Sequence, residues 1–257
     1  MVKTYSNIHE AYLGSLHDVY HDYEYRSSPR GLPIREKLDF CFKILNPSSE
    51  SIITRDEERN KVIAAYTEKE KQLYDSGSCL VEDFSKASKF WEKLANPDGT
   101  INSAYGHLIW HKRSHGNPLY ESGESRPHKG NSHTMRTPWE WCVQSLRQDK
   151  DTRQAVLRFS LPEHFWVGNK DQTCTLSGNF LIREDKLHLS IVMRSNDLVK
   201  GLVYDLPWFC SLMDKMVEDL KPNYPNLIKG HYTHLVHSAH VYEKDAATVE
   251  KMIQNDQ

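Results

Sequence analysis

Cys174 and Arg194 are the pair of residues in this sequence whose types suggest covalent chemistry. A cysteine thiolate is a strong nucleophile, and a nearby guanidinium lowers the pKa of a thiol from about 8.5, which raises the thiolate fraction. Taken alone, the pair is better explained by a buried strand cysteine, because cysteine is among the most buried residue types. The pair therefore predicts a nucleophile only where the fold brings the two side chains together.

A β-hairpin between them would do so. The apolar residues 180–182 are followed by a polar stretch at 183–186. Residues 187–193 then alternate apolar and other side chains at the period of two that is typical of a strand. The second strand would lie antiparallel to the first, so we expect Cys174 and Arg194 at the same, open end of the hairpin.

The segment after Cys174 resembles the thymidylate synthase family. In that family the catalytic cysteine is followed by Arg-Ser-x-Asp, then by a glycine and a base-recognising asparagine. The same register here holds Arg-Ser-Asn-Asp at residues 194–197, then Gly201 and Asp205. Two departures, Thr-Cys-Thr at 173–175 in place of Pro-Cys-His and Asp205 in place of the asparagine, resemble the deoxycytidylate (dCMP) hydroxymethylase branch.

The resemblance implies a folate-dependent hydroxymethyltransferase. The expected reaction takes a one-carbon unit from 5,10-methylenetetrahydrofolate to C5 of dCMP and adds water, giving 5-hydroxymethyl-dCMP and tetrahydrofolate. Cys174 would form a covalent adduct with C6 of the pyrimidine. Such enzymes make modified DNA precursors in phage infection. No metal is expected, because the histidines of residues 111–137 have no zinc-motif spacing with a cysteine.

Asp205 determines the expected base. Cytosine presents a donor at N4 and an acceptor at N3, which a protonated aspartate matches by accepting from N4 and donating to N3. An asparagine matches the opposite order on uracil. A mispaired buried polar edge costs about 1–3 kcal/mol per unsatisfied group. An alternative role for Asp205, which can coexist with the first, is the N-cap of the helix that follows it.

The resemblance also assigns roles to residues elsewhere in the chain. Glu70 and Tyr105 would handle protons on the pyrimidine beside Cys174 and Asp205, with Glu68 on the opposite side of the helix from Glu70. The predicted nucleotide contacts are Arg30 (or Arg26), Arg153, Arg194, Ser195, Asp205, His240 and Tyr242. The predicted folate contacts are Asp197, Gly201 and Trp91, although an aromatic residue such as Trp91 on an amphipathic helix is more often core.

The family fold is the expected fold, an α/β (α+β) unit with a mixed sheet covered by helices. One sheet face would form the interface of a homodimer, with Arg153 reaching the phosphate site of the other subunit. Gln154 occupies the place of the family's second phosphate arginine. A neutral amide replaces only the hydrogen bond of a guanidinium and not its charge, which puts the affinity for phosphate in doubt.

Periodicity places the elements around these residues. We expect helices over residues 8–23, 57–75, 83–95, 139–147 and 205–220, and strands over 38–45, 155–160 and 231–242. Residues 111–137 are polar and rich in His, Gly, Ser and Pro, and we interpret them as a surface loop over the pocket. Residues 1–257 are predicted to form a single catalytic domain.

Composition excludes several classes of protein. With a formal charge of −2, a nucleic-acid polymer is not an expected partner. The sequence contains no apolar run of membrane-spanning length and no signal peptide, so we expect neither a membrane partner nor secretion. The five cysteines form no Cys-x-x-Cys pair, which favours free thiols in a reducing cytoplasm.

Three alternative functions stay open at the level of sequence. A dCMP 5-methyltransferase would need the same Cys174 and Asp205 and would differ only in its product. A CMP hydroxymethylase would differ at the ribose 2′ position. A catalytically silent nucleotide-binding relative would bind dCMP without turnover; the joint presence of Cys174, Arg194, Asp197 and His240 argues against it.

Overall fold

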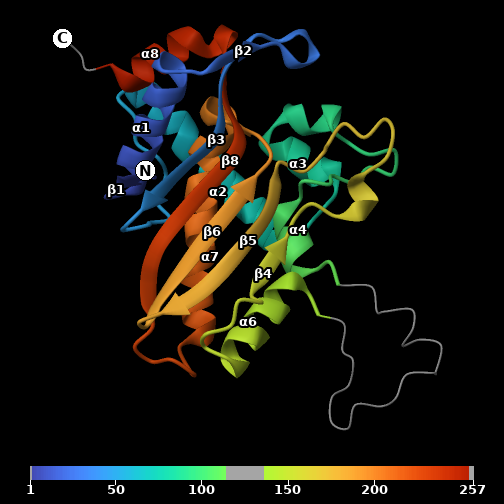
Figure 1. The fold of residues 1–257 in the computed structure, drawn as a ribbon. Helices are drawn as coiled ribbons and strands as arrows, with labels where there is room; N and C mark the ends of the chain where they lie inside the picture. Colours follow the sequence, from blue (N-terminus) through green and yellow to red (C-terminus); the bar gives the residue numbers. More distant parts are fainter. Residues whose placement is uncertain (1, 114–135, 255–257) are drawn as a thin grey trace.

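The computed structural model describes residues 2–113 and 136–254, which contain an eight-stranded mixed sheet. The main order of strands is β1-β3-β8-β6-β5-β4, with β2 beside β3 and β7 beside β8 (Figure 1). The central pair β6 and β8 is parallel, whereas β3–β8, β5–β6 and β4–β5 are antiparallel. The strand bounds are β1 Lys3–Tyr5, β2 Tyr25–Ser27, β3 Ile34–Ile44, β4 Val156–Arg158, β5 Thr175–Arg183, β6 Lys186–Met193, β7 Asn196–Asp197 and β8 Ile228–Tyr242.

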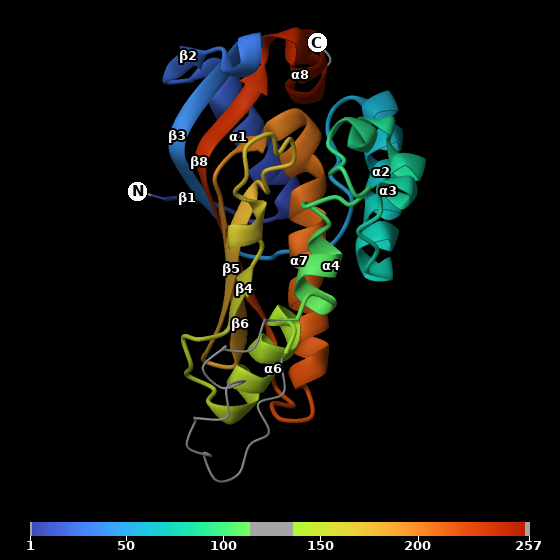
Figure 2. The same cartoon turned by 90° about the vertical axis from the view of Figure 1, so that its right-hand side faces the viewer.

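The helices gather on one side of this sheet, and no described helix lies across its other face (Figures 1 and 2). Figure 2 shows α7 next to the sheet, with α2 and α3 as an outer layer. The expected mixed α/β architecture is therefore confirmed. The helix bounds are α1 Ile8–His21, α2 Glu57–Ser76, α3 Val81–Ala87, α4 Tyr105–Trp110, α6 Pro138–Gln148, α7 Val203–Leu220 and α8 Ala246–Ile253.

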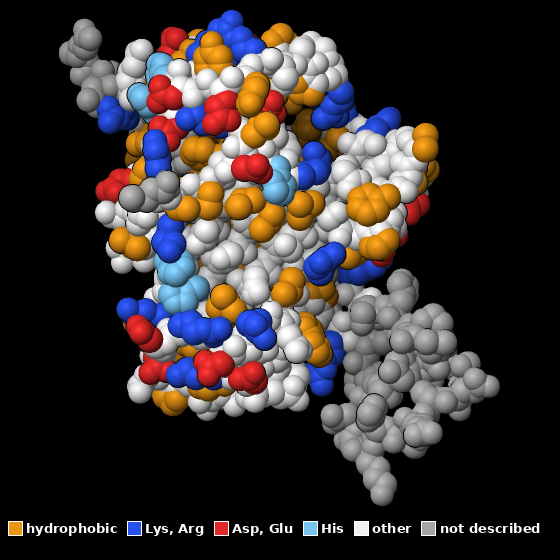
Figure 3. All heavy atoms as spheres, in the orientation of Figure 1, with side chains coloured by type: hydrophobic (Ala, Val, Ile, Leu, Met, Phe, Trp, Pro, Cys, Tyr) orange, Lys and Arg blue, Asp and Glu red, His pale blue; other side chains and the backbone are white. Residues whose placement is uncertain are grey.

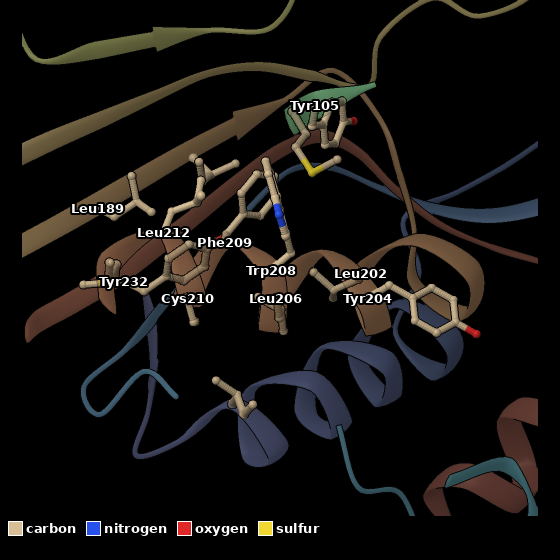
Figure 4. Packing of buried hydrophobic residues seen from close by; sticks show 14 of the residues in the cluster. Tyr105, Leu189, Leu202, Tyr204, Leu206, Trp208, Phe209, Cys210, Leu212 and Tyr232 are labelled. Atoms are coloured by element: carbon tan, nitrogen blue, oxygen red, sulfur yellow. The ribbon is translucent and has the colours of Figure 1, made fainter. Parts of the chain in front are cut away.

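The core lies between α7 and the sheet. Figure 4 shows Trp208, Phe209 and Leu212 of α7 gathered there, with Tyr105 of α4 nearby. The ring centroids of Tyr105 and Trp208 are 5.6 Å apart. The apolar alternation of β6 faces this core, since Leu187, Leu189, Ile191 and Met193 are buried. Burial of this apolar layer fixes the register of the strands.

The β5–β6 hairpin forms as predicted. Its turn residues, Glu184 and Asp185, both have positive φ, of 51° and 57°. Two such residues are typical of the type I′ turn, whose twist matches that of the flanking strands. The hairpin therefore joins at Arg183–Lys186 and opens at the end that carries Cys174.

Two element predictions were wrong. The helix expected over 83–95 is divided, because Ser88 has an extended backbone and its hydroxyl accepts from the Phe90 amide, beginning a separate 3₁₀ turn at Lys89–Lys93. This local hydrogen bond competes with helix continuation. The helix expected from Asp205 begins at Val203.

Most of the predicted loop over 111–137 lies outside the described residues. Within residues 2–113 and 136–254, no helix is both long and apolar enough to span a membrane.

Candidate active site

Cys174 and Arg194 lie side by side, as predicted. The Arg194 amide donates to the Cys174 carbonyl oxygen at 2.9 Å, and Arg194 Nη2 lies 3.6 Å from Cys174 Sγ. Arg194 Nε also donates to the carbonyl oxygen of Thr173 at 3.0 Å. The guanidinium therefore holds the backbone in front of the thiol as well as the thiol itself.

The expected effect on the thiol is only partly correct. Burial raises the pKa of Cys174, and the charges of Arg194 and Arg30 lower it by less, so the net direction is upward in the ligand-free protein. A thiolate away from water loses its hydration, and one guanidinium does not replace all of it. The sequence predicted the cation and could not predict the degree of burial.

Buried hydrogen bonds fix the chain on both sides of Cys174. Before it, both carboxylate oxygens of Asp171 accept from Ser103, Oδ2 from the amide at 2.7 Å and Oδ1 from the hydroxyl at 2.5 Å. After it, the amide and hydroxyl of Thr175 both donate to the Tyr105 hydroxyl oxygen, at 3.2 and 3.0 Å. The Tyr105 hydroxyl thus keeps its own hydrogen free to donate, and its predicted role in proton transfer stays a prediction.

Asp205 lies in the first turn of α7, not at its N-cap, which is Leu202; the N-cap alternative is wrong. Asn196 Nδ2 donates to Asp205 Oδ2 at 2.7 Å. Burial raises the pKa of Asp205 to about 6; the Asn196 bond opposes this and the charge of Asp197 adds to it. The carboxyl is therefore able to hold a proton near neutral pH.

Gly201 lies behind this pair. A Cβ atom at Gly201 would meet Asn196 Nδ2 at 3.0 Å and Asp205 Oδ2 at 3.3 Å, so a larger residue would press on both groups. Asp197 begins the π-helical turn Leu198–Leu202 by accepting from the amides of Val199 and Lys200. Gly201 and Asp197 are thus placed to shape the loop that leads to Asp205, and their predicted folate contacts stay predictions.

Glu70 points inward from α2, as expected, and Glu68 is exposed. Burial raises the pKa of Glu70 to about 8, and the charge of Asp205 adds to the rise. Hydrogen bonds from Tyr66 and Tyr74 act in the opposite direction. The site therefore holds two buried carboxyls, and the charge of Asp205 raises the pKa of Glu70.

Of the predicted sugar and phosphate residues, His240, Tyr242 and Arg30 lie near Cys174 and Asp197. His240 pairs with Asp197 in register, and the rings of His240 and Tyr242 are 5.3 Å apart. Both side chains thus share one face, as expected from their spacing. The charge of Arg30 lowers the pKa of Tyr242, as it does that of Cys174, although burial raises the pKa of Tyr242 overall.

Arg30 is exposed, with a left-handed backbone at φ 54° and ψ 29°. The alternative phosphate ligand, Arg26, lies 3.8 Å from the Glu243 carboxylate. Arg30 is therefore the better candidate of the two. Ser195, half-buried next to Arg194, keeps its predicted role as a prediction.

Two predicted residues lie apart from this cluster. Trp91 is buried, donates from Nε1 to the Tyr66 hydroxyl at 3.2 Å and packs edge-on against Phe84, so its contacts are those of a core residue. Arg153 is exposed near the opposite end of β5, where Arg183 donates to the Asp151 carbonyl. The length of β5, at about 3.3 Å per residue, separates that end from Cys174 by about 30 Å.

Sequence reasoning assigned no role to Asn196, Asp171 or Ser103. Asn196 belongs to the Arg-Ser-Asn-Asp motif at 194–197, but the sequence did not show that its side chain contacts Asp205. Asp171 and Ser103 are far apart in sequence, and only the fold brings them together.

The family model described as thymidylate synthase matches residues 59–257. The deoxycytidylate 5-hydroxymethyltransferase of Enterobacteria phage T6 is 29% identical over 186 residues, covering 70% of this chain and 67% of the relative. The phage T4 enzyme of the same name is 29% identical over 160 residues, covering 60% and 56%. The matched region thus spans between about half and two thirds of these relatives.

One further sequence relative and one solved structure are also similar to this chain. The deoxyuridylate hydroxymethyltransferase of Bacillus phage SP01 is 34% identical over 154 residues, covering 58% of this chain and 36% of the relative. Thermostable thymidylate synthase A from Bacillus subtilis has a similar structure, with a TM-score of 0.67 at 17% identity, covering 97% of this chain and 84% of that chain.

Proposed function

Because this chain belongs to the thymidylate synthase family of folate-dependent transferases, we propose that it hydroxymethylates dCMP at C5. The one-carbon unit comes from 5,10-methylenetetrahydrofolate, and the products are 5-hydroxymethyl-dCMP and tetrahydrofolate. The observation that carries the choice of base is Asp205, a buried carboxyl with a raised pKa in the place of the family's asparagine. In its neutral form it is complementary to cytosine when the oxygen that faces N3 carries the proton.

The mechanism begins with Cys174. Its Sγ forms a bond to C6 of the pyrimidine, and the electron pair of the C5–C6 double bond makes C5 nucleophilic. C5 then forms a bond to the one-carbon unit, loses its proton and, as tetrahydrofolate departs, carries an exocyclic methylene. Water adds to this methylene, and the C6–Sγ bond breaks as the ring double bond returns.

Buried groups move the protons. Glu70, with a pKa of about 8, is able to exchange a proton with water beside the ring at neutral pH. The Tyr105 hydroxyl accepts from Thr175 and so directs its own hydrogen outward. Asp205, as a donor to N3, draws charge from the ring while Cys174 adds.

The phosphate site requires two chains in this proposal. Arg30 and Arg194 come from the chain that supplies Cys174, whereas its own Arg153 lies near the far end of β5. A second copy packed on the open face of the sheet would supply the missing cation. Figure 3 shows mostly uncharged side chains and backbone in the middle of this face. By strand register, its partly buried members are Cys41, Ser177, Asn179, Ser190, Val192, Thr233 and Leu235.

The test is mass spectrometry of the nucleotide products after incubation with methylenetetrahydrofolate and equimolar dCMP, CMP and dUMP. We expect dCMP alone to gain the mass of CH₂O. A gain of CH₂ would indicate a methyltransferase, and modification of CMP a ribonucleotide enzyme. Modification of dUMP would contradict the role of Asp205; the similarity to a deoxyuridylate enzyme makes this comparison necessary.

Cys174→Ala is the matched variant. We expect it to bind dCMP in equilibrium dialysis and to form no product. Wild-type protein that binds dCMP and never turns it over would instead favour the silent nucleotide-binding relative.

A further inference from the structure

Asn196 has a buried oxygen without a partner. Its side chain is 3% exposed, and Nδ2 donates to Asp205 Oδ2 at 2.7 Å. Its Oδ1 has no hydrogen-bond partner among the described residues. Leaving a buried acceptor unpaired costs about 1–3 kcal/mol, so an orphan of this kind next to a substrate-binding carboxyl points to a ligand group.

The backbone holds the amide in place. Asn196 belongs to β7 and lies opposite Ala239 of β8. On its other side lies Gly201, where a Cβ atom would lie 3.0 Å from Asn196 Nδ2, so the amide occupies space that a larger residue would take. The amide and the Asp205 carboxyl thus form one hydrogen-bonded unit next to Gly201.

The Asn196 bond restricts where a proton on Asp205 sits. A carboxyl oxygen that accepts a hydrogen bond from an amide N–H is the less readily protonated of the two. The proton of neutral Asp205 therefore lies on Oδ1. Asp205 then offers a donor at Oδ1 and an acceptor at Oδ2, with the orphan Oδ1 of Asn196 as a second acceptor nearby.

Resting on the proposed function, we infer that Asn196 is a base-selecting residue. It fixes the orientation of the Asp205 proton and accepts a hydrogen bond from the exocyclic amino group of cytosine. Cytosine N3 takes the Asp205 proton, and the two N4 hydrogens meet Asp205 Oδ2 and Asn196 Oδ1. Uracil O4 is itself an acceptor and would face two acceptor oxygens without a donor. This unpaired contact would select against dUMP.

Other titratable groups surround Asp205 and bear on any pH measurement. Those whose charges act on Asp205, or on which Asp205 acts, are Glu70 and Tyr74 of α2, Tyr105 of α4, Cys174, Asp197 of β7 and Tyr232 of β8. A limb of the pH profile that shifts when Asn196 is substituted, and does not shift when these groups are substituted, is assigned to Asp205.

The experiment measures kcat/KM for dCMP and dUMP in competition, for wild type, Asn196→Ala, Asp205→Asn and the double variant. We expect Asn196→Ala to lower the dCMP preference by about 5- to 100-fold, the loss of one buried hydrogen bond. The alkaline limb for dCMP should move to higher pH, because the amide favours the ionised carboxylate. In the Asp205→Asn background, Asn196→Ala should change the base ratio by less than in wild type, because only the direct bond to N4 is lost and there is no Asp205 proton left to orient.

Asn7→Ala is the control, because it removes the amide that caps α1, outside the site. It should lower stability and leave the base ratio unchanged. If Asn196→Ala proves unstable, Asn196→Ser keeps a small donor and should show an intermediate ratio. A dCMP-selective wild type whose ratio and alkaline limb are unaffected by Asn196→Ala overturns this inference and leaves the proposed function intact; a wild type without dCMP turnover overturns the proposed function itself.

Discussion

At the scale of single residues, the site depends on carboxyls that the fold keeps partly neutral. Glu70 and Asp205 have pKa values raised to about 8 and about 6, in both cases mainly by burial. The charge of ionised Asp205 also helps Glu70 to hold its proton, because two nearby carboxylates repel each other. Carboxyls with pKa values raised in this way are able to donate and accept protons near neutral pH.

Burial of Glu70 has a cost that depends on pH. Its folded pKa lies above its unfolded value of about 4.5, so the folded state binds the extra proton. The free energy of unfolding should therefore fall as pH rises from about 4.5 through about 8, by a few kcal/mol. Glu70→Gln should remove this fall and be the more stable protein at pH 9.

Urea denaturation at pH 5, 7 and 9 measures the effect. Glu68→Gln, two residues away and exposed, is the control and should keep the wild-type pH dependence. Parallel pH profiles for wild type and Glu70→Gln would mean that Glu70 titrates normally in the folded protein.

At the scale of elements, two segments clamp the nucleophile. The turn before α4 holds the loop before Cys174 through Ser103 and Asp171, and α4 itself holds β5 through Tyr105 and Thr175. The hydrogen bonds of both clamps go to groups other than the thiol. Their role is to keep Cys174 facing Arg194.

Removing the first clamp should loosen the nucleophile. Asp171→Ala leaves the Ser103 amide unpaired and should cost about 1–3 kcal/mol of unfolding free energy, and Ser103→Ala, which keeps the amide bond, should cost less. Both variants should increase the rate at which iodoacetamide alkylates Cys174, with Asp171→Ala the faster. An unchanged alkylation rate in a folded Asp171→Ala protein would mean that the loop is held by Arg194 alone.

The periodicity of apolar residues predicted strands and helices correctly where no other local contact competes. Strand alternation at 187–193 predicted the hairpin and so the meeting of Cys174 with Arg194, and helical rotation separated Glu70 from Glu68. The prediction failed where a competing contact decides, as at Ser88, whose hydroxyl ends a helix. It also failed for the thiol pKa, because burial comes from segments that are distant in sequence and packed around Cys174.

At the scale of the whole molecule, the proposed phosphate residues of one chain do not all lie together. Cys174, Arg30 and Arg194 meet at one end of the sheet, and Arg153 lies near the far end of β5. The proposed dimer would join the two ends from different chains.

This arrangement predicts complementation. Arg153→Ala and Cys174→Ala proteins should each have little activity alone. Mixed and allowed to exchange subunits, they should recover about a quarter of wild-type activity, because half of the dimers are mixed and each has one intact site. Leu235→Glu, on the open sheet face, should yield monomers in analytical ultracentrifugation. Recovery that is absent despite demonstrated exchange would place Arg153 outside the site.

The π-helical turn Leu198–Leu202 has a consequence for how substrate choice can change over generations. One residue along a helix is about 100° of rotation, so loss of a single codon within this turn would swing Asp205 away from Asn196 without altering either residue. An insertion or deletion in this turn should therefore alter base selection more than most single substitutions would. Libraries that seek a new base preference should vary the length of the turn together with the identity of the side chains.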